Sequence, residues 1–234
     1  MLQQLLITIG AGVASAVFFY LPAKGSLFAF VLGLFASLPL LIVAFGYGVR
    51  SAVIAAAAGA LLAAAMLDGW LAIAFLLSVA FPALVLGHMA ARPSPDESAL
   101  LRGLLCTIVA VTIALDFLGI FVIGSRYASF DAAIDDLASR FEPLISAVFA
   151  RTGVPGGATA KEFSATLVLA MGPVMAAWGV FALALNCWIA GWVTLLSGRL
   201  ARPWPDVARH LGLPRWTIMV FALLFALTLS TGAI

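Results

Sequence analysis

The apolar residues of this 234-residue chain gather in long runs that short polar links separate. A helix that crosses the hydrocarbon core of a bilayer, roughly 30 Å thick, needs about 20 mostly apolar residues. Because most links hold only a few residues, adjacent helices are expected to pack antiparallel in one all-α bundle. The runs predict seven membrane-spanning helices, at residues 2–21, 26–47, 51–67, 70–88, 101–124, 163–197 and 216–234.

Composition places the chain among the integral membrane proteins. Hydrophobic residues make up 65% of it and charged residues 9%, and the mean hydropathy is +1.19. A soluble domain carries about a quarter charged residues. The net charge of +2 is far too small to indicate a nucleic-acid surface. We therefore expect one multi-pass domain over residues 1–234, with the lipid bilayer as its partner.

Basic residues near helix ends indicate the orientation, because they stay on the cytoplasmic side of a membrane. With a cytoplasmic N-terminus, the links on that side carry seven arginines, whereas most basic residues of the other side lie in one long segment. This distribution predicts a cytoplasmic basic loop at 198–215 and an outer segment at 125–162. The seven arginines are Arg50, Arg92, Arg102, Arg199, Arg202, Arg209 and Arg215.

The outer segment carries a helical stripe, since its apolar residues recur at steps of three or four with charged residues between them. This pattern predicts an amphipathic helix on the membrane surface or at the mouth of the bundle. It either covers helix ends only or forms a lid over an outward-facing site. The stripe consists of Phe130, Ile134, Leu137, Phe141, Ile145 and Phe149.

Prolines within the apolar runs predict irregular helices. The run at 163–197 would measure about 52 Å as a helix, so it must tilt, break or protrude, and Gly172-Pro173 favours a kink. Pro39 and Pro82 allow similar local breaks. Broken helices expose backbone groups to substrates in transporters, although proline is also common in ordinary membrane helices.

Asp116 is the one ionisable side chain well inside a predicted span, which makes it a candidate functional residue. Thr112 lies one helical turn before it on the same face, whereas Thr107 points away. Asn186 lies at a comparable depth in the long run, with Trp178 two turns earlier. Asp116 and Asn186 either form a helix–helix hydrogen bond or belong to a substrate or proton site. Trp178 either stacks on a flat ligand or anchors the helix at the headgroup level.

The first span has small residues four apart, which let another helix approach closely. Gly10 pairs with Ala14 in this way, and Ala11 pairs with Ser15. Such faces serve either packing inside the bundle or the docking of a partner subunit.

Enzymatic signatures are absent from the sequence. His88 and His210 have no metal-binding context, and Cys106 and Cys187 lie in apolar runs where thiols mostly pack. We expect no catalytic residue, metal or cofactor.

The cytoplasmic N-terminus, the small residues at 10–16 and the Ala/Gly/Phe-rich early spans resemble a family of bacterial inner-membrane proteins of unknown function, widespread in alphaproteobacteria. That family is loosely akin to the S components of energy-coupling-factor vitamin transporters. In S components the first helix docks on a coupling subunit, so the resemblance implies this role for Gly10 and Ala14, or for Ala11 and Ser15. One departure is the short link after the first helix, where S components carry a substantial gating loop.

Three functions follow from these observations. The chain is a small-molecule binding or transport subunit, with its site in an outward cavity under the outer helix. Alternatively, it is a structural or assembly protein that holds partner subunits, which needs a tightly packed bundle without a polar cavity. An intramembrane enzyme is the third reading, and it needs a polar cluster that the sequence does not reveal.

Overall fold

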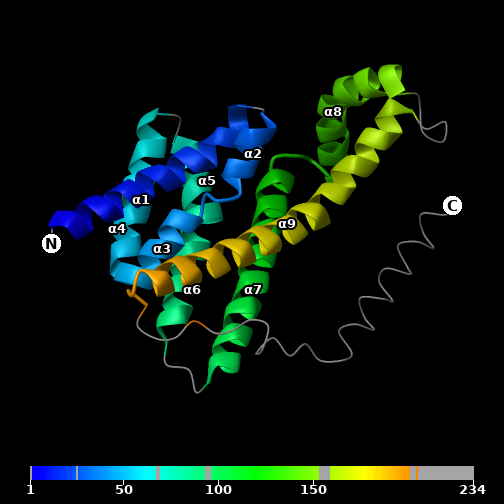
Figure 1. Cartoon of the computed structure of the whole chain (residues 1–234). Coiled ribbons are helices and arrows are strands. Elements are labelled where there is room, and N and C mark those ends of the chain that lie inside the picture. The colour runs from blue at the N-terminus through cyan, green and yellow to red at the C-terminus, as the bar shows by residue number, and fades with distance from the viewer. Residues whose placement is uncertain are drawn as a thin grey trace.

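The computed structural model describes residues 2–24, 26–66, 69–92, 96–152, 159–200 and Trp204. All regular elements within these residues are helical, as the all-α prediction requires (Figure 1). In chain order they are α1 (Leu2–Tyr20), the 3-10 turn η1 (Leu21–Lys24), α2 (Leu27–Gly33), α3 (Leu38–Tyr47), α4 (Val49–Met66), α5 (Gly69–Phe75), the π-helical stretch η2 (Leu76–Ala80), α6 (Phe81–Ala91), α7 (Glu97–Gly124), α8 (Phe130–Thr152) and α9 (Ala160–Leu196).

Five described segments are long and apolar enough to cross a membrane. A sixth apolar helix, α4, is shorter, with its apolar part over Val49–Ala65. Six of the predicted runs are therefore helical, whereas the seventh, at 216–234, lies outside the described residues, as does most of the 198–215 loop. The five segments are Leu2–Ala23, Phe28–Tyr47, Gly69–Ala91, Glu97–Val122 and Ala160–Leu196.

Helix irregularities lie next to both Pro39 and Pro82, where the sequence allows local breaks. A four-residue turn at 34–37 divides the second span into α2 and α3, and Pro39 lies in the first turn of α3. The Leu38 N–H donates to the Phe35 carbonyl at 3.0 Å, so the Leu34 carbonyl does not receive the bond that a continuous α-helix would give it. The π-helical stretch ends just before Pro82, which has no N–H to donate to the preceding turn.

Helix α9 stays helical through Pro173 over its 37 residues, about 55 Å at 1.5 Å per residue. Its excess length is accommodated by protrusion, since its first half extends away from the bundle with α8 folded back along it (Figure 1). A capping box fixes its start: the Glu162 N–H donates to Thr159 Oγ1 at 3.2 Å, and the Thr159 N–H donates to Glu162 Oε2 at 2.9 Å.

The apolar face of α8 lies partly against α9. Ala133 and Ala138 are buried, and the Phe149 ring meets the ring of Phe163 on α9 edge to face, with centroids 5.4 Å apart. The predicted amphipathic helix is confirmed, and its apolar face packs on α9.

The tightest packing joins α1 to α4 in the body of the bundle. A Cβ atom on Gly12 would lie 2.0 Å from the Ala55 carbonyl oxygen, and one on Gly59 would lie 2.7 Å from the Gly12 carbonyl oxygen. Only glycine at both positions permits this approach. The surrounding core buries Leu40, Leu41, Phe75, Leu86, Leu104 and Ile108.

We predict that Gly12→Ala destabilises the protein and that Gly10→Ala does not. A methyl group on Gly12 strikes the Ala55 backbone, and overpacking of this kind costs about 1–3 kcal/mol. Gly10 has nothing within 4 Å of an added Cβ. Thermal unfolding in detergent measures both variants, and equal melting temperatures would contradict the α1–α4 contact.

Candidate functional site

A cavity of about 390 Å³ lies where the α2–α3 break meets α7 and α9. All four sequence-predicted ligand residues line it: Thr112, Asp116, Trp178 and Asn186. We call this space the polar cavity. The structure brings the four residues together around one space.

Asn186 is 1% exposed and ties α9 to the break in the second span. Its Nδ2 donates to the Leu34 carbonyl at 2.7 Å and to Ser37 Oγ at 2.8 Å. A carbonyl can only accept a hydrogen bond, so the Leu34 contact fixes which way the amide faces. The Asn186 Oδ1 atom is left as an acceptor that has no partner among the described residues.

Thr112 lies at a close crossing of α7 and α9. A Cβ on Gly179 would be 2.8 Å from the Thr112 γ-methyl, whereas the hydroxyl lies farther off, at 3.8 Å. Packing of the methyl on Gly179 therefore directs the hydroxyl elsewhere. Thr112 is 6% exposed, and its Oγ1 has no hydrogen-bond partner in the part of the chain that the structure describes.

Asp116 follows one turn later on α7, and its Oδ2 is also buried without a partner among the described residues. Four buried side-chain atoms in the described ranges share this condition, and three of them, on Thr112, Asp116 and Asn186, belong to residues that line the polar cavity. Buried polar atoms are nearly always hydrogen-bonded in proteins. Their gathering around one cavity points to a ligand that supplies the partners.

The predicted direct bond between Asp116 and Asn186 is not found. The amide of Asn186 is committed to the second span, so both residues present oxygen atoms without partners. The sequence analysis did not identify Leu34 or Ser37 as residues of the cavity. Pro39, which it did identify as a possible break, was the signal that a nearby backbone carbonyl would lose its helical hydrogen bond.

Aromatic rings form another wall of the polar cavity. Trp178 stacks on Phe30 of α2, with ring centroids 5.8 Å apart and planes inclined by 25°. The Phe181 ring also neighbours Trp178, with its centroid 6.0 Å away. The two lining rings, Phe30 and Trp178, are 45% and 38% exposed, so they offer free surface.

A second cavity, of about 430 Å³, lies between α7, α8 and α9. We call it the apolar cavity, because Asp116 is the one polar side chain among the described residues that line it. Asp116, Leu115 and Met175 line both cavities, which therefore adjoin at Asp116. The apolar stripe of α8 supplies one wall, with Phe130, Ala133, Ile134, Leu137 and Phe141.

A hydrogen-bond cluster at the start of α8 fixes its approach to α7. Tyr127, in the turn between the helices, donates its hydroxyl to Asp136 Oδ2 at 2.6 Å, and Arg140 Nη2 donates to the same oxygen at 2.9 Å. The Tyr127 hydroxyl and then the Arg140 guanidinium lower the pKa of Asp136 below its usual range. The same bond raises the pKa of Tyr127.

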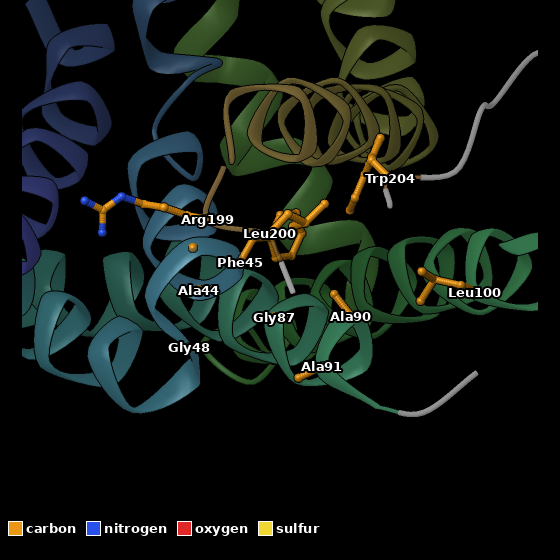
Figure 2. A pocket seen from close by; sticks show the side chains of 11 residues that line it. Ala44, Phe45, Gly48, Gly87, Ala90, Ala91, Leu100, Arg199, Leu200 and Trp204 are labelled. Carbon is orange, nitrogen blue, oxygen red and sulfur yellow. The ribbon is translucent and has the colours of Figure 1, made fainter. Parts of the chain in front are cut away.

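A third cavity, of about 280 Å³, lies at the end of the bundle where α3, α6 and α9 finish. Its one charged lining residue is Arg199, whose guanidinium stacks 4.5 Å from the Tyr47 ring centroid. Figure 2 shows this guanidinium turned away from the other labelled side chains. The indole of Trp204 packs on Gly191, at whose Cβ position it leaves no space. Among its described lining residues, Arg199 and Trp204 carry the side-chain polar atoms.

The proposed interface residues of α1 divide between two environments. Ser15 is fully buried and donates its hydroxyl to the Ala36 carbonyl, and Ala11 packs on the core. The Ala11–Ser15 pair therefore serves packing inside the chain, because Ser15 has no surface left for a partner. Gly10 is exposed and Ala14 is half-buried, so this pair remains accessible.

Metal ligands do not gather in the described residues, where no group of three or more His, Cys, Asp or Glu side chains is placed to hold an ion.

Comparison with known proteins identifies a family: a family model described as "Predicted membrane protein (DUF2232)" covers residues 13–234. No curated protein and no solved structure matches the chain.

We predict that Asp136 titrates below the usual carboxyl range and that Tyr127→Phe raises its pKa. A carboxyl whose pKa is lowered by folding stabilises the fold above its ordinary pKa, and this stability is lost as the pH falls through the folded-state pKa. Loss of the Tyr127 hydroxyl makes that acid-dependent loss smaller. Carboxylate carbon shifts in detergent micelles report the titration, with Tyr47→Phe as the control. An Asp136 pKa that Tyr127→Phe leaves unchanged would contradict the cluster.

Proposed function

Because the chain belongs to the DUF2232 family of predicted membrane proteins and holds a polar cavity between its helices, we propose that it is a small-molecule binding subunit of a membrane transport system. The observation that carries the proposal is the set of three buried polar atoms around that cavity that have no partner among the described residues. A structural protein needs no such cavity, so the geometry favours binding over the alternative of a scaffold for partners.

Two helix irregularities support a transport role. The α2–α3 turn contributes Leu34, Ala36 and Ser37 to the cavity wall, and the π-helical stretch contributes Ser78 and Val79. Interrupted helices at membrane depth are tolerated where they are buried or line a cavity, and they commonly mark substrate sites. Each interruption here lies on the same cavity as Asp116.

The proposed orientation puts the N-terminus in the cytoplasm of a bacterial inner membrane. The chain segments that bear Arg50, Arg92 and Arg199 come to one end of the bundle, where the third cavity lies (Figure 1). This clustering supports a cytoplasmic end there and an outward-facing α8. The accessible Gly10–Ala14 face of α1 is then the proposed contact for a partner subunit, as the resemblance to S components implies.

Asp116→Asn is expected to abolish ligand retention and to leave the protein folded. An unpartnered buried carboxylate oxygen costs stability, so its loss keeps or raises the melting temperature. Native mass spectrometry after gentle detergent extraction measures retained small molecules and partner subunits together. The proposal would be wrong if Asp116→Asn strongly lowered the melting temperature and the unsubstituted protein retained no small molecule. Asp116 would then be a structural residue.

Thr112→Val and Thr107→Val form a matched pair on α7. Valine at 112 keeps the methyl contact with Gly179 and removes a hydroxyl that has no partner among the described residues, so ligand retention falls and stability is unchanged or higher. Thr107 donates to the Gly103 carbonyl at 2.7 Å and does not line the polar cavity, so Thr107→Val leaves retention unchanged. The same mass spectra measure both variants. Equal loss of the ligand in the two variants would argue against a ligand site in the polar cavity.

A further inference from the structure

The two cavities that meet at Asp116 define one composite site with a polar and an apolar chamber. They share three lining residues, Leu115, Asp116 and Met175. On the polar side lie the Asn186 amide and the Thr112 hydroxyl, and on the other side lies the apolar face of α8. A ligand that fills both chambers must therefore be amphipathic, with its polar group at Asp116.

The polar chamber is a hydrogen-bond acceptor site. The Asn186 amide hydrogens are both used, so only its oxygen is available, and a carboxylate offers oxygen atoms only. The Thr112 hydroxyl can accept as well as donate. Three such groups around one space call for a ligand group with several N–H or O–H donors.

The charge of the Asp116 carboxylate favours a ligand whose donor group is a cation. The described residues that line the two cavities include no lysine, arginine or histidine, so none of them offers Asp116 a countercharge. A carboxylate in a low-dielectric site is stable when a cation pairs with it or a proton neutralises it, and a bound cation supplies the first of these. The aromatic wall of Trp178 and Phe30 provides ring faces toward which a cation is attracted within about 6 Å.

We infer that this site binds the primary ammonium group of an amphipathic amine, with the ammonium at Asp116, Asn186 and Thr112 and the apolar body between α7, α8 and α9. A primary ammonium has three N–H donors, which matches the three acceptors. This inference rests on the proposed function and adds the chemical class of the ligand. A bare metal ion is a poor match for chambers of about 390 and 430 Å³, since one water occupies only about 30 Å³.

Octylamine is the test probe, with octan-1-ol and octanoate as neutral and anionic controls of equal chain length. Equilibrium dialysis and thermal shift in a non-ionic detergent measure binding. Octylamine is expected to bind at least tenfold more tightly than either control and than octyltrimethylammonium, which has no N–H donor. Equal affinity for any of these three compounds would overturn the ammonium assignment, as would thermal stabilisation by Na⁺ alone that depends on Asp116.

Variants locate the bound amine. Asp116→Asn is expected to lower octylamine affinity at least tenfold and Thr112→Val several-fold, whereas Thr107→Val leaves it unchanged. Octylamine binding that survives both Asp116→Asn and Thr112→Val would place the amine elsewhere and overturn the inference.

The amine can be a free molecule or the headgroup of a lipid, and two further measurements separate these sources. Native mass spectra from nanodiscs of phosphatidylethanolamine and of phosphatidylglycerol show whether the aminolipid is retained selectively and is displaced by octylamine, which would identify a lipid. A retained molecule that depends on Asp116 but has no amine would overturn this inference while the proposed function stands. Absence of both amine binding and a retained molecule would overturn both.

Discussion

The contact between Asn186 and the interrupted second span is the interaction on which the site depends. A carbonyl freed at membrane depth must find a donor, because the bilayer core supplies none. The Asn186 Nδ2 meets this demand for Leu34 and also donates to Ser37. Both amide hydrogens are thereby committed, so Asn186 cannot donate to Asp116. The same two hydrogen bonds therefore stabilise the break and leave the Asn186 Oδ1 atom in the cavity without a partner among the described residues.

The described part of the molecule divides into a closely packed body and a more open flank. Glycines at 12 and 59 let α1 and α4 approach to backbone contact, and large aliphatic side chains fill the space behind them. On the other flank, α8 lies along the protruding half of α9 and leaves a cavity between itself and α7. Asp116 lies where the two regions meet, with a rigid body on one side and an amphipathic helix on the other.

Such an arrangement costs stability, as the proposed binding function would require. Three polar atoms without partners among the described residues lower the stability of that region, and a fully apolar contact between α7 and α9 would hold the helices together at less cost. Thr112 illustrates the point, since its methyl already packs on Gly179 and its hydroxyl adds nothing to that contact. Polar groups that do not contribute to helix packing are the features expected of a binding site in a membrane bundle.

Much of this could be derived from the sequence. Apolar run lengths determined the membrane class and six helical runs among the described residues, the period of the stripe determined α8, and Pro39 and Pro82 marked where interruptions could lie. Depth along the helices brought Asp116 and Asn186 to one level. Only the tertiary structure decided that Asn186 donates to Leu34, that Ser15 is buried inside the chain, and that two cavities adjoin at Asp116. Sequence spacing determines which face of a helix a residue occupies, whereas the rotation and crossing of the helices determine which neighbour that face meets.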